Sequence, residues 1–374
     1  MMTRPNPHDR PERSIGATVD GVMQDPVMLG EDELSLVNAL QIAPRASWSL
    51  LGGVLGADPV TVARRWQRLT RTGRAWATAY GSPVLMRQTC LALVAVTCQA
   101  GSLVRIAEAL RDDPHAVTVE HTTGGCDLLV TVWTTGLPDL SRYLVARLGT
   151  LPGIAVTRTT VITNLYAEGS SWRLGVLDVP QQDRLRRTVP AVSGVEATVR
   201  PEDRPLVVRL GRDARTPYPE LASAAGISPA TARRRVSRLL SGGLLALRCE
   251  LARAESYWTV SATLWINVPP GELAGTAAAL AARPETRLVA AVAGSTNLVI
   301  TVWLRGLADL QRLEATLTAR WPYLSVVDRA VVLRHYKLMG RVLDESGRAL
   351  RAVDMDIWRD PAPGGAVHDR QVRE

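Results

Sequence analysis

The sequence has little lysine, little cysteine and no long apolar segment, and each shortage excludes a class of protein. Lys337 is the only lysine, so arginine supplies almost all of the positive charge. The 4 cysteines show neither CxxC spacing nor a histidine at zinc-site spacing, which argues against a metal site and a disulfide framework and favours reduced thiols. No run of about 18 apolar residues occurs, so we expect no membrane span. The polar amino terminus does not resemble a signal peptide, and we therefore expect a cytoplasmic protein.

The composition is that of a globular protein suited to an acidic partner. Of the 374 residues, 46% are hydrophobic and 21% are charged, which is enough to bury the cores of about two to four domains. The formal net charge is +8 and the pI is about 9.8, a balance that favours nucleic acid as a partner. Arginine can bond phosphate and guanine bidentately, although codon bias in a GC-rich genome would produce the same enrichment.

Residues 221–245 are the most informative stretch, because they predict two helices joined by a glycine turn. Gly226 can adopt the left-handed conformation that ends the first helix. Ser228 and Pro229 suit the cap and the first position of the second helix. No acidic residue occurs from Pro229 to Cys249. A basic helix after a tight turn is typical of a helix-turn-helix that enters the DNA major groove, and a merely solvated arginine-rich face is the alternative.

The same pattern occurs earlier in the chain, in residues 48–73. Three pairs of equivalent residues are each separated by 170 positions: Gly56 and Gly226, Pro59 and Pro229, and Trp133 and Trp303. The offset holds without a gap between residues 51–161 and 221–331. The sequence therefore predicts two tandem copies of one two-domain module, which we call the first copy and the second copy.

Each helix pair is followed by a short apolar segment and then by a strand and helix alternation. The short segments, residues 75–80 and 244–250, could form the wing of a winged helix. The alternation predicts β-α-β-β-α-β, the ferredoxin-like arrangement, at residues 91–97, 103–110, 116–121, 128–133, 137–148 and 154–165, and again at 261–268, 273–281, 287–292, 298–303, 307–317 and 324–335. One face of such a sheet must be covered, within one chain or between chains.

These patterns define an α+β protein with seven segments. We expect a disordered arm at 1–28, winged helix-turn-helix units at 29–82 and 201–252, ferredoxin-like domains at 83–167 and 253–342, a linker with one short helix at 168–200, and a tail at 343–374 that is disordered beyond about Asp360.

A helix-turn-helix followed by this six-element domain resembles the Lrp/AsnC (feast/famine) family of transcriptional regulators, and three motifs carry the resemblance. They are SPATARRRVSRL at 228–239, TGGCD at 123–127, which is similar to the family's Gly-x-x-Asp loop, and LPGI at 151–154. The resemblance spans residues 29–167 and 204–337. It implies a sequence-specific regulator that binds double-stranded DNA, forms homo-oligomers, and senses an amino acid or related small molecule through its ferredoxin-like (RAM/ACT-like) domains. It implies no cofactor and a place at the nucleoid.

The predicted DNA-binding residues lie on the two second helices. They are Thr61, Arg64, Arg65, Arg68, Ser228, Thr231, Arg234, Arg235 and Arg238. Arg65 and Arg235 lie nearer the core edge, where they would only solvate the helix, and each threonine could simply stabilise the first turn. Trp66 stands where the second copy has Val236, so whether the first copy still binds DNA stays open.

The resemblance places the effector site at the two loops that precede a middle strand. The predicted residues are Thr123, Gly124, Asp127, Gly294 and Asn297. Asp127 would receive an ammonium group, and the alternatives are a carboxylate that caps the turn and ordinary hairpin glycines. Asn297 lacks this charge, so the second copy is either a degenerate sensor or binds a different ligand.

An enzyme is the alternative function. Siroheme decarboxylase subunits share the Lrp/AsnC-like fold and work in pairs, which a tandem chain could mimic. Arginines would then hold tetrapyrrole carboxylates, and His115 or His121 would be the catalytic or ligating groups. Neither histidine recurs at the 170-residue offset, and both second helices remain basic, so we favour a regulator without enzymatic activity.

Overall fold

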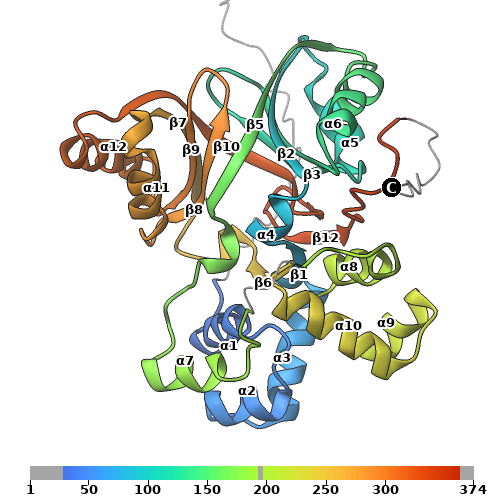
Figure 1. The fold of residues 1–374 in the computed structure, drawn as a ribbon. Coiled ribbons are helices and arrows are strands. Elements are labelled where there is room, and N and C mark those ends of the chain that lie inside the picture. Colours follow the sequence, from blue (N-terminus) through green and yellow to red (C-terminus); the bar gives the residue numbers. More distant parts are fainter. Residues whose placement is uncertain (1–27, 193–196, 363–374) are drawn as a thin grey trace, which may run out of the picture.

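The computed structural model describes residues 28–192 and 197–362. Figure 1 shows two groups of helices at one end of the molecule and two helix-covered sheets at the other. Almost all of the predicted amino-terminal arm lies outside the described residues. Within the described chain, no helix is long and apolar enough to cross a membrane.

Each helix-turn-helix unit consists of three helices. The first unit contains α1 (Glu31–Ile42), α2 (Trp48–Leu55) and α3 (Pro59–Arg71), and the second contains α8 (Arg204–Arg212), α9 (Tyr218–Ala225) and α10 (Pro229–Ser241). Gly56 ends α2 with φ of 66°, and Gly226 ends α9 with φ of 64°. The side chains of Asp58 and Ser228 accept hydrogen bonds from the first turns of α3 and α10. The predicted helix-turn-helix pattern is thus confirmed in both units.

The predicted wings do not form. The segment after each unit is a single strand, β1 (Ala75–Gly81) or β6 (Leu245–Leu251), and the two strands pair with each other in an antiparallel two-stranded sheet. Among the residues that the structure describes, neither strand has a second strand in its own unit. Because buried backbone groups need hydrogen-bond partners, each segment finds them on its counterpart from the other copy. This shared sheet, with Thr78 opposite Arg248, joins the two halves.

The ferredoxin-like order is confirmed in both copies. The first domain contains β2 (Cys90–Cys98), α5 (Leu103–Arg111), β3 (Ala116–Thr122), β4 (Leu128–Thr134), α6 (Leu137–Arg142), a π-helix (Tyr143–Leu148) and β5 (Ile154–Ala167). The second contains β7 (Val260–Asn267), α11 (Leu273–Ala281), β8 (Thr286–Ala293), β9 (Leu298–Leu304), α12 (Ala308–Arg320) and β10 (Ser325–Leu338). A short helix, α4 (Pro83–Met86), precedes the first domain.

The two sheets join edge to edge into one closed ring. The early part of β5 pairs with β2 of its own domain, and its end pairs with β8 of the other. β10 does the same with β7 and β3. The ring order is therefore β10-β3-β4-β2-β5-β8-β9-β7. Its inner surface buries a cluster that includes Leu93, Leu129, Leu165 and Val299, while helices cover the outside (Figure 1). The open sheet faces thus cover each other within one chain.

The linker and the tail both pack against the helical units. The linker holds the expected short helix, α7 (Val179–Arg186), and buries Trp172 and Leu177 in the core of the first unit. The tail prediction is wrong for residues 343–362. β11 (Arg341–Leu343) and β12 (Ala349–Ala352) extend β10, and Met355 and Ile357 then pack into the core of the second unit. Residues 363–374 lie outside the described chain.

Candidate DNA-binding face and ligand cavities

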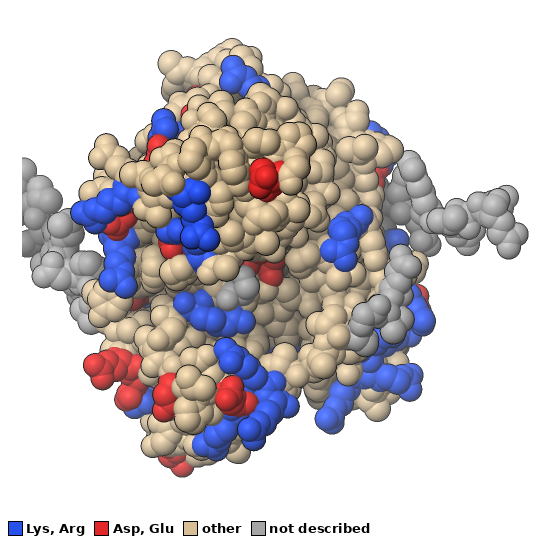
Figure 2. All heavy atoms as spheres, turned by 60° about the vertical axis from the view of Figure 1, so that its left-hand side comes forward, with Lys and Arg blue, Asp and Glu red and all other residues tan. Residues whose placement is uncertain are grey.

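Each recognition helix, α3 or α10, presents one equivalent arginine to solvent. Arg64 and Arg234 are exposed, stand 170 residues apart, and make no ion pair or hydrogen bond with any described residue. Figure 2 shows many basic side chains over the lower part of the molecule, where Figure 1 places the helical units. These two arginines are therefore the members of the predicted set that are best placed to reach DNA.

In the first unit, two predicted arginines are held by carboxylates of α1. Arg65 pairs with Asp32 at 2.6 Å, and its side chain is only 26% exposed. Arg68 pairs with Glu33 at 2.7 Å but remains 56% exposed. Arg68 can therefore exchange its partner for a phosphate, whereas Arg65 fits the alternative interpretation of a residue at the core edge.

In the second unit, one buried carboxylate holds both remaining arginines. Arg238 and Arg235 pair with Asp203, whose side chain is 1% exposed. Arg235 also donates a hydrogen bond to the carbonyl oxygen of Glu202 at 3.1 Å. Without these arginines the buried Asp203 carboxylate would have no paired positive charge, which is unfavourable. We therefore expect Arg235 and Arg238 to be held more strongly by Asp203 than Arg65 and Arg68 are held by the carboxylates of α1.

The predicted residues with hydroxyl groups are expected either to contact DNA or to stabilise the first turn of the helix, and they differ in which interpretation they fit. The Ser228 Oγ accepts a hydrogen bond from the Thr231 backbone at 3.2 Å and donates one to the Thr231 Oγ1 at 3.0 Å, so this pair stabilises the first turn of α10. Thr61 is exposed at the start of α3. Arg233, which the sequence analysis did not select, is exposed beside Arg234 and has no described partner. DNA contact by any of these residues stays a prediction.

A reciprocal pair of arginines fixes the two units relative to each other. Arg45 donates to backbone carbonyls within residues 214–216, and Arg215 donates to those within residues 44–46, at 2.5–3.1 Å. Each guanidinium lies over an aromatic ring of the other unit, with centroid distances of 4.7 Å for Arg45 and 4.0 Å for Arg215. The sequence analysis missed this contact, although the two arginines stand 170 residues apart and that offset could have revealed them.

In the predicted effector loops, Asp127 and Asn297 occupy equivalent positions and make equivalent contacts. The Asp127 carboxylate accepts a hydrogen bond from the Cys98 backbone at 2.7 Å. The Asn297 amide bonds both the backbone N–H and the carbonyl of Val268, at 3.0 and 2.6 Å. This geometry favours the backbone-capping interpretation, and a role for either residue in effector binding stays a prediction.

The other predicted loop residues shape the backbone of the ring. Thr123 exchanges two hydrogen bonds with the Val331 backbone on β10. Gly124 has φ of +90°, and a Cβ there would stand 2.6 Å from the Arg329 carbonyl oxygen, so only glycine fits. Gly294 lacks this constraint. A cavity of about 290 Å³ lies beside these loops, but their neighbours line it instead: Gly125, Cys126, Ser295 and Thr296.

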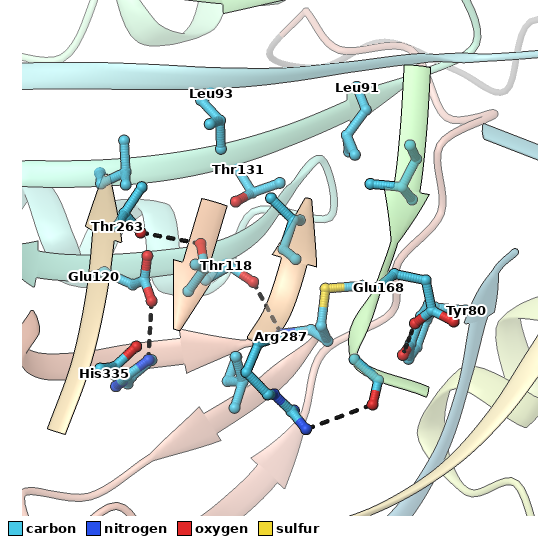
Figure 3. A pocket seen from close by; sticks show the side chains of 18 of the residues that line it. Tyr80, Leu91, Leu93, Thr118, Glu120, Thr131, Glu168, Thr263, Arg287 and His335 are labelled. Carbon is cyan, nitrogen blue, oxygen red and sulfur yellow. Dashed lines mark hydrogen bonds and ion pairs between the residues drawn. The ribbon is translucent and has the colours of Figure 1, made fainter. Parts of the chain in front are cut away.

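A second, smaller cavity lies between the sheets at their helical end (Figure 3). Its volume is about 120 Å³. Arg248 and Arg287 line it and share one buried carboxylate, Glu250, with Arg287 Nη2 3.2 Å from both oxygens. Burial raises the pKa of Glu250 to about 7 despite the neighbouring Arg248. Both arginines of this cavity are thus engaged by a carboxyl group of the protein itself.

The opposite wall of this cavity carries a histidine that the sequence analysis did not select. His335 Nε2 donates to Glu120 at 2.9 Å, and its Nδ1 accepts from Arg253 at 3.0 Å (Figure 3 shows the first contact). Burial, reinforced by Arg253, lowers the pKa of His335, so the neutral ring is favoured. His115 and His121 do not line the cavity.

The described residues offer no evident metal centre. No group of three or more histidine, cysteine, aspartate or glutamate side chains in this part of the chain is arranged to hold a metal ion. All 4 cysteines are free, and burial raises the pKa of the Cys249 thiol, so this thiol stays protonated. The expectation of reduced thiols is confirmed.

Two family models match separate parts of the chain. The Lrp/AsnC ligand binding domain matches residues 91–172, which include the first ferredoxin-like domain. The AsnC-type helix-turn-helix domain matches residues 203–240, which form the second helical unit. The two matches thus come from different copies.

Similar proteins include regulators and an enzyme. An HTH-type transcriptional regulator FL11 of Pyrococcus horikoshii is 27% identical over 143 residues, 38% of this chain and 94% of the relative. An uncharacterized HTH-type transcriptional regulator of Pyrococcus furiosus is 27% identical over 144 residues, covering 38% of this chain and 97% of the relative. The siroheme decarboxylase NirDL matches 88% of this chain and 96% of its own, with a TM-score of 0.55 and 13% identity, which shows a shared fold. Through the two matched regions, residues 91–172 and 203–240, the chain resembles the Lrp/AsnC family, since one matches its ligand binding domain and the other its helix-turn-helix domain.

Proposed function

We propose that this chain is a DNA-binding transcriptional regulator formed by tandem duplication of one Lrp/AsnC module. The observation that carries the proposal is the equivalent placement of Arg64 and Arg234. Both side chains are exposed on recognition helices and lack a described partner. An arginine with no internal contact keeps its donors for phosphate or for guanine.

The reciprocal contacts of Arg45 and Arg215 support a defined geometry for reading DNA. They hold the helical units in a fixed relation, so one chain would present two recognition helices to two half-sites. The ring already covers the open sheet faces inside one chain. A homo-oligomer would therefore add further pairs of heads through other surfaces, and an amino acid or related effector at the loops around Asp127 would modulate this assembly at the nucleoid.

Binding to labelled DNA from the protein's own upstream region, across a salt series, tests this function. We expect tight binding that weakens steeply as salt rises, because arginines displace counterions from phosphates. The variant Arg64→Ala/Arg234→Ala should lose most of this binding while keeping its fold. Arg351→Ala, on the far strand β12, serves as the matched control. Absence of salt-dependent binding by the wild type at low ionic strength would exclude the proposal.

A siroheme-decarboxylase-like enzyme is the second candidate, favoured by the match of NirDL to both halves of the chain. Three observations argue against it, and the first two concern the cavity between the sheets shown in Figure 3. Its volume of about 120 Å³ is below the roughly 300–1,000 Å³ of drug-sized ligand sites. Its arginines are engaged by Glu250. His115 is buried elsewhere, against the carbonyl of Arg359. A titration with an iron tetrapyrrole that changes the absorbance spectrum saturably would instead favour the enzyme.

A further inference from the structure

A cavity between the shared two-stranded sheet and the carboxy-terminal hairpin has no assigned role. Its volume is about 290 Å³, and it lies apart from the two effector loops. Its walls come from β1, the segment after β6, β10 and the turn between β11 and β12. The hairpin belongs to the segment that follows the second ferredoxin-like domain, so this cavity depends on a part of the chain outside the repeated modules.

Three buried N–H groups around this cavity lack an acceptor. Trp76 is 4% exposed, and its indole Nε1 has no hydrogen-bond partner among the described residues. Within the described chain, Nη1 of Arg253 and Nε of Arg334 are also buried atoms without a partner, although both residues are only half-buried, and all three residues line the cavity. Buried donors are rarely left unpaired, because each loses its hydrogen bonds to water on folding. Three in one cavity point to an acceptor that binds there.

Arg253 also lacks a counter-charge in contact. Within the described chain, the Arg253 side chain makes one hydrogen bond, to His335, and no ion pair. The neutral form of His335 is favoured, so this contact supplies no negative charge. Burial lowers the pKa of Arg253 to about 10, only partly offset by the more distant Glu120. A buried charge without a partner is unfavourable, so a bound anion would stabilise this site.

The remaining walls restrict the type of anion. Leu251, Leu338 and Leu343 line the cavity together with the Trp76 ring, so an apolar body fits beside the donors. At the rim, Asp344 accepts hydrogen bonds within the hairpin turn and Glu345 pairs with Arg334 at 3.1 Å. Their two carboxylates would repel a multiply charged anion such as phosphate. A single carboxylate on an apolar body satisfies both conditions.

We infer that this cavity binds a small organic carboxylate, with Arg253 and Trp76 donating to its oxygens. The ligand would bridge the strand that follows the first helical unit and the carboxy-terminal hairpin. This hairpin is tied to the same unit by ion pairs, since Arg348 pairs with Glu255 at 3.0 Å and Arg74 pairs with the other oxygen of Glu255 at 2.6 Å. The site is thus distinct from the loop site and does not depend on DNA binding.

Titration calorimetry of the full chain without DNA tests the inference, with pentanoate and phenylacetate as probes and pentanamide and phosphate as comparisons. We expect saturable binding of at least one carboxylate and much weaker binding of both comparisons. Arg253→Gln should weaken it by about tenfold or more, and Trp76→Phe by a few-fold, because a hydrogen bond to a charged group is lost in each. Arg351→Gln and Trp358→Phe, outside the cavity, should change nothing.

A spectroscopic readout keeps the test independent of small stability changes. Of the 10 tryptophan indole N–H resonances, the one that disappears in Trp76→Phe should shift on addition of the carboxylate. No saturable binding of either carboxylate to the wild type would overturn the inference, as would undiminished affinity in folded Arg253→Gln. Phosphate or pentanamide binding as tightly as the carboxylates would overturn the ligand class. Because no DNA is present, none of these outcomes bears on the regulator proposal.

Discussion

The two helical units use the same ion pair in different surroundings. Glu33 and Arg68 in the first unit stand 170 residues before Asp203 and Arg238 in the second. The Arg68 side chain is 56% exposed and that of Arg238 is 32% exposed, while Asp203 is almost completely buried. The second unit therefore holds its arginine more tightly, although it is the unit that matches the helix-turn-helix model. The unit whose sequence matches the helix-turn-helix model is therefore not the unit whose arginine is more available for DNA.

The segments that cover the two units also differ. In the first unit, the Asn38 amide oxygen accepts hydrogen bonds from the linker backbone at Val176 and Leu177, and α7 packs over α2. In the second unit, the carboxy-terminal segment buries Met355 and Ile357 against the helices. Both segments bury apolar side chains, and the linker adds these hydrogen bonds to the Asn38 side chain. Equivalent folds in the two copies are stabilised by unrelated flanking sequences.

Among the substitutions considered, replacing Asp203 should change the free energy of unfolding most, and it tests the difference between the two ion pairs directly. Asp203→Ala leaves Arg235 and Arg238 without their buried partner, and we expect a loss of about 3 kcal/mol in the free energy of unfolding. Asp32→Ala removes a carboxylate that is 72% exposed and should cost less than about 1 kcal/mol. Urea unfolding of both variants measures the difference. Equal losses would mean that the burial of Asp203 does not matter to stability.

Single substitutions at the recognition helices compare how much each helical unit contributes to DNA binding. Arg64→Ala and Arg234→Ala should each weaken DNA binding by about 1–3 kcal/mol if both heads contact the duplex. A loss confined to Arg234→Ala would identify the second unit as the reader. Fluorescence anisotropy with a fixed salt concentration measures both. As a control, Arg65→Ala removes an arginine already paired with Asp32 and should have a smaller effect; a larger one would contradict the assignment of Arg64.

The reciprocal arginines test whether the units act as one body. Arg45→Ala removes two hydrogen bonds to carbonyls of the other unit, and we expect a loss of about 2 kcal/mol in the free energy of unfolding. Arg215→Ala should behave alike. Because both contacts lie at one interface, the double variant should lose less than the two single losses added together. Strict additivity in urea unfolding would show that the two contacts are independent.

Local patterns in the sequence predicted the repeated parts of this fold well. The turn glycines, the helix caps and the alternation of strands depend on neighbouring residues, and the constant offset then placed both copies. The pairing of β1 with β6 could not be predicted in this way, because a lone strand reveals nothing of its distant partner. The folding of residues 343–362 was missed for the same reason, since β11 and β12 are short and owe their structure to β10.

Candidate site residues were predictable only as a set. The spacing located the recognition helices, but the ion pairs that separate Arg64 from Arg65 and Arg68 arise from carboxylates on another helix. Likewise His335 has Leu165 as its equivalent in the first copy, so the repeat offered no reason to select it. Its importance follows from facing Glu120 and Arg253, which come from β3 and from the segment after β6.

The second ferredoxin-like domain has His335 where the first has Leu165. This difference gives the smallest expected effect, a dependence of stability on pH. Burial and Arg253 lower the pKa of His335 below its usual 6.5, against the opposing effect of Glu120. The unfolded chain then binds a proton that the folded chain does not. Stability should be complete above pH 6.5 and fall as the pH drops below it, by at most about 1.4 kcal/mol per pH unit for one proton.

Urea unfolding between pH 5.5 and 7.5 (about one unit to either side of the usual histidine pKa) isolates this contribution. His335→Gln keeps a donor for Glu120 but cannot titrate, so it should lose the part of the slope that His335 causes. If His335→Gln and the wild type show the same slope, the His335 ring takes up its proton equally readily in the folded and unfolded chains, and the asymmetry between the two domains is one of packing rather than of charge.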